Sequence, residues 1–255
     1  MRDIQGEADK RNTILNKVGC RKMSCIVNHD SYREWADVSA YISLNSSQRG
    51  AHMSRFVEIF ENTSPQGLSQ STGMLNHYLD QLCKRHEVEE SFVKMKFNYP
   101  YTQIAPESNL PSIRKIPMYL EGERREDSYV YYFRVKLHVT SLCPCSKEIS
   151  EYGAHNQRTL IDTRCRFHED IDFTEFLDCI NLGSAPIIEL LKRPDEKSVT
   201  EEAYENPKFC EDIARDVSIA INEFSGIDNY SIIVESLESI HDHTALAIID
   251  QFKFD

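Results

Sequence analysis

The sequence predicts an α+β fold in which an antiparallel sheet carries its helices on one face. Two observations support this prediction. Segments with alternating apolar residues flank paired segments of helical periodicity, and the order strand–strand–helix–helix–strand–strand occurs twice along the chain. We therefore expect a polar arm at residues 1–19, a first half at 20–122 and a second half at 123–255, with the two halves forming one compact bimodular unit.

In the first half, apolar residues change period from strand-like to helical and back again. The expected elements are a strand at 37–45, helices at 50–62 and 69–86, and a strand at 91–101. Met74, Tyr78 and Leu82 lie on one stripe of the second helix, as a helix that buries one face requires. The first nineteen residues show no such period, so we expect a frayed or partner-bound arm there.

The second half contains the clearest strand of the chain, at 128–142, where apolar residues alternate from Tyr131 to Val139. The further expected elements are a strand at 158–167, helices at 172–191 and 205–224, and strands at 230–240 and 244–252. Asp172 with Glu175 three residues later is typical of a helix start. Lys192 and Arg193, directly before a proline, are expected to end that helix.

Composition bounds the classes of function. The net charge of −12 argues against non-specific binding of nucleic acid, which needs a basic face. No apolar run approaches the roughly 20 residues that span a bilayer, so no membrane partner is expected. The chain opens on polar residues rather than an apolar leader, and its eight cysteines are scattered. We therefore expect a cytoplasmic protein with reduced thiols.

The segment "SLCPCSKEISEYGAHNQR" (141–158) is a candidate metal site. Cys143 and Cys145 are separated only by Pro144, and no second cysteine pair follows, so a structural zinc site is disfavoured. A thiolate with His155 would leave coordination positions open, which is what a catalytic metal requires. The alternative is two cysteines at a strand end and a surface histidine, and this segment alone leaves both open.

The segment "ESIHDHT" (238–244) is a candidate acid–base site. His241 and His243 are two residues apart, so on an extended backbone both side chains point to the same side. Glu238 precedes them, and a carboxylate beside a histidine can tune it or act as a base itself. The alternative is a polar turn between two strands.

Two helix starts carry charges that suit a nucleotide. Glu211 lies in an expected first turn, where a carboxylate is stabilised and could accept two N–H groups of a guanine edge. His52 and Arg55 begin another helix, a position that suits phosphate. Lys147 and Arg158 could add positive charge. The alternatives are a solvated acidic segment around Glu211 and an ordinary amphipathic helix start at His52.

Together the motifs resemble one family. The resemblance rests on "TSLCPCSKEISEYGAHNQR", "GAHMSRF", "LLKRPDEK", "TEEAYENPKF" with "EDIARDV", and "VESLESIHDH". They are similar to motifs of the type IB GTP cyclohydrolases, over most of the chain from about Val38. Asp242 is a departure, because that family more often has asparagine there. The resemblance implies the tunnelling fold with two tandem ββααββ halves, and a homotetramer whose strands close into barrels with active sites at subunit interfaces.

The resemblance also implies a reaction, the opening step of tetrahydrofolate biosynthesis. GTP and water would give formate and 7,8-dihydroneopterin 3′-triphosphate. The resemblance implies metal ligation by Cys143, His155 and Glu196, with Cys143 also counted as catalytic. It implies acid–base catalysis by Glu238 and His241 and guanine anchoring by Glu211. Further substrate contacts are implied for His52, Arg55, Lys147 and Arg158. One divalent metal per site is implied, Zn²⁺ or Mn²⁺, with Fe²⁺ as a further choice.

Two other readings of the chain stay open. A thiol enzyme of the same fold would use Cys143 to attack a substrate carbon covalently. A non-catalytic purine-binding assembly protein would bind GTP and leave it unchanged. Neither of these would release formate from GTP, so formate release separates the implied reaction from both, and metal that is lost with Cys143→Ala separates it from the thiol enzyme.

Overall fold

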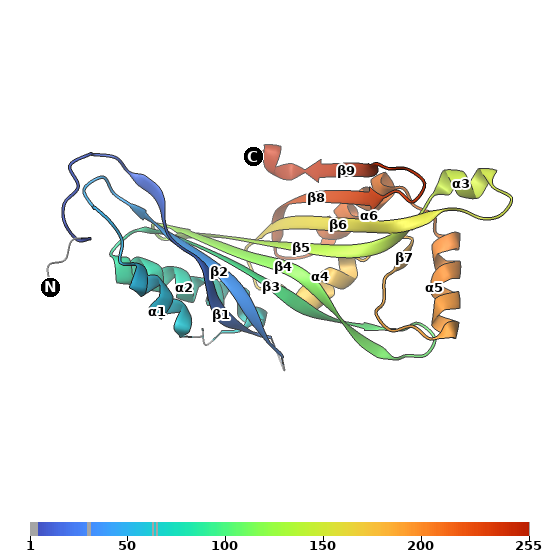
Figure 1. The fold of residues 1–255 in the computed structure, drawn as a ribbon, viewed down its shortest axis with the longest axis horizontal. Helices are drawn as coiled ribbons and strands as arrows, with labels where there is room; N and C mark the ends of the chain where they lie inside the picture. The colour runs from blue at the N-terminus through green and yellow to red at the C-terminus, as the bar shows by residue number, and fades with distance from the viewer. Residues whose placement is uncertain (1–4, 30–31, 63, 65, 255) are drawn as a thin grey trace. The chain divides into compact units, whose positions relative to one another are not determined.

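The computed structural model describes residues 5–29, 32–62, 64 and 66–254, and it contains one sheet with helices on one face (Figure 1). The strands are β1 (Leu15–His29), β2 (Tyr32–Leu44), β3 (Glu90–Ile104), β4 (Pro111–Arg125), β5 (Ser128–Leu142), β6 (Asn156–Phe167), β7 (Ala185–Pro186), β8 (Ile227–Leu237) and β9 (Thr244–Asp250). The helices are α1 (Met53–Glu61), η1 (Leu68–Gln70), α2 (Ser71–His86), α3 (Pro144–Ile149), α4 (Phe173–Ile180), α5 (Arg193–Glu205), α6 (Cys210–Glu223) and η2 (Gln251–Phe254). The fold class predicted from the sequence is confirmed.

The predicted repeat of elements is also present. The strand order is β1-β2-β3-β4-β5-β6-β8-β9, with β7 paired to β5. In chain order, β1-β2-α1-α2-β3-β4 is followed by β5-β6-α4-α6-β8-β9, and α3, β7 and α5 are additions to the second half. The expected boundary between the halves, at residue 122/123, falls inside β4, shortly before β5 begins the second repeat.

The chain forms two compact units, which we describe separately. Unit 1 contains residues 1–98, 118–133 and 167–171, and unit 2 contains 99–117, 134–166 and 172–255. The units are interleaved along the chain because β3, β4 and β5 contribute residues to both.

In unit 1, β1 and β3 pair with β2 in antiparallel register. The inward residues of β2, Val38, Ala40 and Ile42, are buried, and α1 and α2 cover one face of the strands (Figure 1). The rings of Phe60 and Tyr78 stack with centroids 4.6 Å apart and join the two helices. This core explains the apolar stripe that the sequence shows on α2.

β1 begins at Leu15, inside the segment expected to be a polar arm, so that expectation is wrong for residues 15–19. A Cβ atom on Gly19 would lie 1.9 Å from the Ala40 carbonyl oxygen, so this close approach of the strands requires glycine. The register then shifts between Cys20 and Met23, where Lys22 has a φ of 60°. This β-bulge interrupts the alternation that would have identified the strand.

In unit 2, α4 and α6 pack together on one face of the strands around β8 (Figure 1). Phe176 of α4 and Val217 of α6 are fully buried, and the ring of Phe224 packs edge-on against Phe176 at 5.4 Å. Asp172 accepts hydrogen bonds from the backbone N–H groups of Thr174 and Glu175, as the predicted helix start requires.

The helix expected at 172–191 is wrong beyond Ile180. A Cβ atom on Gly183 would lie 2.5 Å from Cβ of Val139, so the chain here lies directly against β5. Ser184 N donates to the Thr140 carbonyl oxygen at 2.7 Å, and the following residues pair with β5 as β7. Hydrogen bonding to β5 thus replaces a continued helix.

Lys192 precedes a helix rather than ending one, which corrects a second expectation. It is the N-cap residue of α5, and Pro194 lies in the first turn, where a missing N–H group costs nothing. The helix expected at 205–224 is α6, which begins only at Cys210, because α5 ends at Glu205 and residues 206–209 connect the two helices. The amide of Asn206, between them, donates to the Gly183 and Ser184 carbonyl oxygens at 3.2 Å.

We predict that Gly183→Ala lowers the free energy of unfolding by about 1–3 kcal/mol, because the added methyl group overpacks the contact with β5. Urea denaturation measures the change. Gly73→Ala in α2 is the matched control, since its Cβ would meet only the flexible side chain of Gln66, at 3.4 Å. The control should be stabilised by about 0.5–1 kcal/mol. Equal stability of the Gly183 variant and the native chain would contradict the packing argument.

Candidate functional site

The loop between β5 and β6 brings Cys143 and His155 together. Cys143 N donates to the His155 carbonyl oxygen at 3.1 Å, and His155 N donates to Ser146 Oγ at 3.3 Å. The Cys143 sulfur caps α3 by accepting the Ser146 backbone N–H at 3.4 Å. Gly153, with a φ of 114°, provides the turn that returns the chain to β6. The backbones of Cys143 and His155 are therefore hydrogen-bonded at the base of one loop.

A polar network connects His155 to Glu238. His155 Nδ1 lies 3.0 Å from Gln157 Oε1 and 3.3 Å from Ser239 Oγ. Gln157 Nε2 donates to Ser141 Oγ at 3.0 Å and to Glu238 Oε1 at 3.4 Å. Gln157 was not predicted, although it follows His155 by two residues and on an extended backbone lies on the same side. The proposed ligand and the proposed acid–base group thus share one amide.

Glu211 lies in the first turn of α6, as predicted, next to a buried thiol. Cys210 Sγ donates to Glu211 Oε2 at 3.2 Å. Burial, followed by the hydrogen bond and charge of Glu211, raises the pKa of Cys210 to about 12, and the charge of Glu238 contributes to this rise. Both carboxylates therefore act on one neutral thiol. The sequence signalled this partner only by its adjacency to Glu211.

Glu196 is positioned by its buried neighbour, Asp195. The Asp195 carboxylate accepts the backbone N–H groups of Glu107, Ser108 and Lys192 and the Ser108 hydroxyl, at 2.7 to 2.9 Å. Burial raises the pKa of Asp195, but these hydrogen bonds outweigh burial and hold it below its usual range. Asp195 is therefore ionised at neutral pH, and its stabilising effect is lost only as the pH falls below about 4 toward the lowered pKa.

The donor set fits a divalent metal in chemistry, but the structure assembles it only in part. Cys143 and His155 supply a soft thiolate and an imidazole, the ligands that zinc prefers. Glu196 is exposed, and no hydrogen bond or ion pair holds its carboxylate within the described residues. No group of three His, Cys, Asp or Glu side chains in the described chain lies close enough to hold an ion. The structure thus joins two of the three predicted ligands, Cys143 and His155, through a backbone hydrogen bond.

His241 lies in the exposed loop between β8 and β9, three residues after Glu238. Its ring stacks on His243, with centroids 5.0 Å apart and planes 11° from parallel. The two side chains therefore point to the same side, as their spacing predicts.

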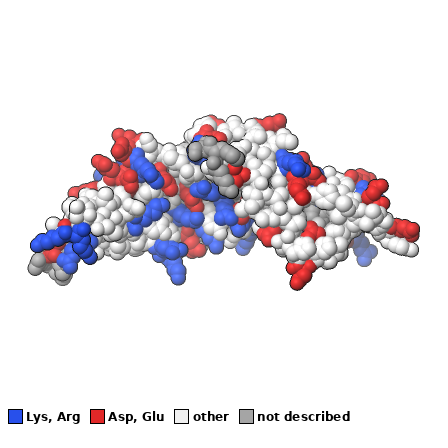
Figure 2. Space-filling view, turned by 90° about the horizontal axis from the view of Figure 1, so that it is seen from above, with Lys and Arg blue, Asp and Glu red and all other residues white. Residues whose placement is uncertain are grey.

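The predicted cations Arg158 and Lys147 have different surroundings. Burial lowers the pKa of His138, and the charges of Arg114, Arg158 and Lys136 lower it further, so these side chains form a basic cluster. Only Arg158 of this cluster was predicted from the sequence. Lys147 instead donates to the Tyr204 carbonyl oxygen and lies 4.5 Å over the Tyr204 ring centre. Figure 2 likewise shows basic side chains in small groups among acidic ones on the face in view.

His52 and Arg55 lie in unit 1, whereas the other predicted site residues lie in unit 2. Arg55 Nη1 donates to the Arg85 carbonyl oxygen at 2.7 Å, near the end of α2. His52 and Arg55 line a pocket of about 440 Å³ together with His86, which is 6% exposed. Burial, then the charges of Arg55 and His52, lowers the pKa of His86 to about 4, so its ring is neutral in the pocket wall.

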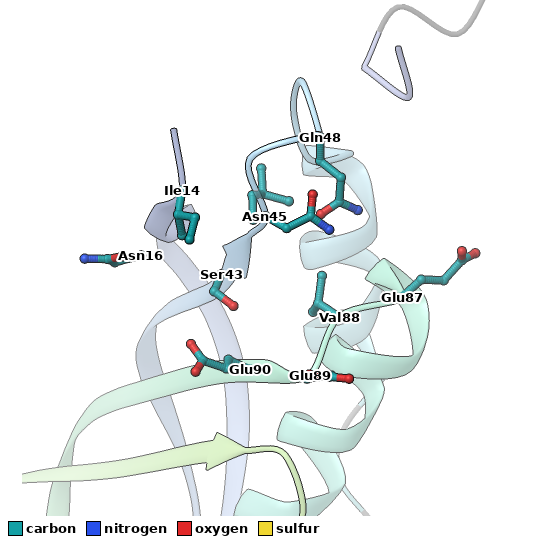
Figure 3. A pocket seen from close by; sticks show the side chains of 10 residues that line it. Ile14, Asn16, Ser43, Asn45, Gln48, Glu87, Val88, Glu89 and Glu90 are labelled. Atoms are coloured by element: carbon teal, nitrogen blue, oxygen red, sulfur yellow. The ribbon is translucent and has the colours of Figure 1, made fainter. Parts of the chain in front are cut away.

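A second pocket of unit 1, of about 500 Å³, contains none of the predicted residues (Figure 3). Its lining includes Glu87, Glu89 and Glu90, which follow one another from the end of α2 to the start of β3. Three carboxylates make this pocket unfavourable for a polyphosphate. The pocket with His52 and Arg55 is therefore the better match to the predicted phosphate contacts.

Comparison with known protein families gives a match over almost the whole chain. Residues 1–247 match the family described as type I GTP cyclohydrolase folE2. A GTP cyclohydrolase FolE2 of Thermotoga neapolitana is 38% identical over 261 aligned residues, covering 100% of this chain and 98% of the relative. A GTP cyclohydrolase FolE2 of Halorhodospira halophila is 37% identical and covers 99% of both chains. The resemblance seen in the motifs is thus confirmed along the full sequence.

Solved structures of other proteins share the fold. Uricase from Arthrobacter globiformis superposes with a TM-score of 0.55 at 11% identity, covering 92% of this chain and 93% of that one. Urate oxidase from Bacillus sp. TB-90 gives 0.52 at 9% identity, covering 93% and 100%. These likenesses confirm the tunnelling fold and, at such identities, show the fold alone. Among the described residues, no helix has the length and apolar character needed to cross a membrane.

Proposed function

Because the chain belongs to the FolE2 family of type I GTP cyclohydrolases, we propose that it converts GTP and water to formate and 7,8-dihydroneopterin 3′-triphosphate. Membership of the family makes the chain an enzyme of folate biosynthesis that acts on GTP. The proposal adds the products, the metal and the roles of individual residues. The observation that carries it is the meeting of Cys143 and His155 at one loop, with Glu238 joined to them through Gln157.

We assign Cys143, His155 and Glu196 to one divalent metal per site. The thiolate favours Zn²⁺, while a carboxylate ligand also suits Mn²⁺ or Fe²⁺. The ion would supply Lewis-acid activation of water near neutral pH, for attack on C8 of the purine. The exposed Glu196 carboxylate has no competing partner among the described residues, which supports its assignment as the third ligand.

Glu238 and His241 are assigned to proton transfer. An acid must protonate an imidazole nitrogen of the purine as its ring opens, and a base must accept the proton that the attacking water gives up. The amide of Gln157 holds one oxygen of Glu238, which orients the carboxylate. His241 follows in a loop and is exposed, so its ring has access to a bound substrate.

Glu211 is assigned to the guanine edge, and the basic side chains to the triphosphate. The Cys210 thiol holds Oε2 of Glu211, which limits the orientations of the carboxylate before guanine binds. Arg158 would contact phosphate with the support of its basic cluster, and His52 and Arg55 from their own pocket. Lys147 is the exception, because contact with a phosphate would cost its hydrogen bond to Tyr204.

We also propose a cytoplasmic homotetramer with active sites at subunit interfaces. β1 and β9 end the strand order, so each has an unpaired edge within the described sheet. Apolar side chains lie exposed on both strands, with Leu15 46%, Leu246 54% and Ile248 57% accessible. All eight cysteines are free thiols, which agrees with a reducing compartment. Sedimentation that showed a stable and active monomer would contradict the tetramer.

We predict that the chain releases one formate for each GTP consumed, and that Cys143→Ala loses both bound metal and formate release. Removing a side chain that hydrogen-bonds a metal ligand typically lowers metal affinity or activity about 10–100-fold. Removing a ligand itself should therefore lower metal affinity by more than about 100-fold. Cys145→Ala is the matched control, because this neighbouring thiol is exposed and makes no hydrogen bond in the described residues. The control should keep both properties.

The same experiment separates the alternatives. GTP that is bound but returned unchanged would indicate a non-catalytic purine-binding protein. A covalent adduct on Cys143, detected by mass spectrometry in a chain that holds no metal, would indicate a thiol enzyme. Loss of metal from Cys145→Ala with retention in Cys143→Ala would reverse the roles of the two cysteines.

We predict opposite effects for two glutamates. Glu211→Gln replaces an acceptor with a donor opposite the guanine N–H groups, which costs about 1–3 kcal/mol of binding. GTP affinity should fall roughly tenfold to hundredfold while metal content stays normal. Glu196→Gln should lose metal and keep the guanine contact. Elemental analysis and equilibrium binding of GTP measure both variants, and the reverse pattern would exchange the two roles.

A further inference from the structure

We propose that Gln157 is a positioning residue: its side-chain amide fixes the tautomer of His155 for metal binding and couples that histidine to Glu238. The inference rests on the proposed function, because it concerns the same site. It assigns a role to a side chain outside the proposed ligand set and outside the proposed acid–base pair. Its basis is the hydrogen-bond network that connects β5, β6 and β8 in unit 2.

The orientation of the Gln157 amide follows from its neighbours. A carboxylate only accepts hydrogen bonds, so the group that faces Glu238 must be the NH₂ of the amide. Gln157 Nε2 lies 3.4 Å from Glu238 Oε1 and 3.0 Å from Ser141 Oγ. The reverse orientation would set the amide oxygen against the carboxylate oxygen. The amide oxygen therefore faces His155, with Oε1 3.0 Å from Nδ1.

This orientation determines which nitrogen of His155 carries the proton. An amide oxygen has no proton to give, so His155 Nδ1 must be the donor of that hydrogen bond. Ser239 Oγ, 3.3 Å from the same nitrogen, can accept from it as well. Nε2 of the neutral ring then keeps its lone pair, which is the form that binds a metal. The carboxylate of Glu238 thus selects the ligand form of His155 through one intervening amide.

A buried frame of hydroxyl groups holds the amide in place. Ser141 of β5, Thr159 of β6 and Ser236 of β8 are at most 1% exposed. Thr159 Oγ1 donates to Ser141 Oγ at 2.8 Å and lies 2.8 Å from Ser236 Oγ. Buried hydroxyl groups need hydrogen-bond partners, so these three linked hydroxyls resist rearrangement. They thereby fix the position of Ser141 Oγ, the oxygen to which Gln157 donates. The orientation of His155 is therefore set by the sheet and not by the exposed loop alone.

Two substitutions of Gln157 distinguish the hydrogen bond of its amide oxygen to His155 from that of its NH₂ group to Glu238. Gln157→Met has nearly the same shape and removes both hydrogen bonds. Gln157→Glu keeps an acceptor for His155 Nδ1–H but sets a carboxylate against Glu238. Cys145→Ala is the matched control, because it removes an exposed thiol of the same loop that makes no hydrogen bond among the described residues. Thermal denaturation checks that each variant is folded, and Gln157→Glu serves as a second variant should Gln157→Met not fold.

Histidine ¹⁵N NMR on the metal-free full-length chain measures the tautomer directly. In the native chain we expect His155 as the Nδ1–H form, and in Gln157→Met a mixture of both forms. Zn²⁺ affinity, measured against a competing chelator, should fall about 10–100-fold in Gln157→Met, as for loss of other outer partners of metal ligands. Gln157→Glu should keep the Nδ1–H tautomer of His155 and should bind Zn²⁺ within about threefold of the native chain. It should nevertheless release formate more slowly, because the new carboxylate disturbs Glu238. A slower reaction with normal Zn²⁺ affinity therefore separates the orientation of Glu238 from metal binding. Cys145→Ala should leave the tautomer, the Zn²⁺ affinity and the melting temperature unchanged.

The outcomes that overturn the inference are separate from failure of the proposed function. An Nε2–H tautomer in the native chain, or an unchanged tautomer and Zn²⁺ affinity in folded Gln157→Met, would overturn it even if native protein releases formate. A Gln157→Glu chain that loses the tautomer as Gln157→Met does would also overturn it. If the native chain releases no formate, the proposed function fails, while the tautomer and Zn²⁺ measurements still decide the role of Gln157.

Discussion

The last residues of β5 hold together several segments of the candidate site in unit 2. Leu142 N donates to Ser184 Oγ at 3.0 Å, and the Leu142 carbonyl oxygen accepts the Lys208 backbone N–H at 3.1 Å. The next residue, Cys143, pairs with the backbone of His155. Loop 143–155 and the segments before α5 and α6 thereby converge on one strand end. This convergence explains why the proposed ligands, although distant in sequence, share one unit.

Apolar packing supports the same place. Leu142, Ala185 of β7 and Ala203 of α5 form a small buried cluster, with Ala154 and Val199 packed against it. α5 is polar over most of its surface, so this contact and the Asp195 hydrogen bonds hold it, since propensity alone leaves a short helix marginal. The first turn of α5, which presents Glu196, is therefore positioned by a buried carboxylate at one end and by small apolar residues at the other.

The parts of the fold that could be predicted from sequence are those in which one period continues without interruption. β5 alternates over its whole length, and α2 and α6 each keep one apolar face. β1 could not be predicted because its bulge breaks the alternation, nor α5 because polar contacts rather than an apolar stripe hold it. Gly183 shows the same limit, since the strand that excludes its Cβ lies more than forty residues earlier in the chain.

The candidate site divides along the same line. Cysteine, histidine and glutamate with characteristic spacing mark chemistry by their type, so Cys143, His155 and Glu238 could be proposed as site residues before the fold was known. Gln157 and Asp195 carry no such mark. Their roles exist only through partners from other strands and loops, such as Glu238 and Ser108. Side chains that orient reactive groups are therefore the part of a site that needs coordinates.

The composition of β9 has a consequence for a protomer apart from its partners. This edge strand reads Thr-Ala-Leu-Ala-Ile-Ile-Asp, and its first six residues carry no charge and no proline. Natural edge strands are commonly protected by lysine, proline or a bulge, which act as gatekeepers against pairing with foreign strands. A protomer of the proposed tetramer that is released during folding or by dilution therefore exposes this unprotected edge to other strands, so that correct assembly would compete in rate with aggregation.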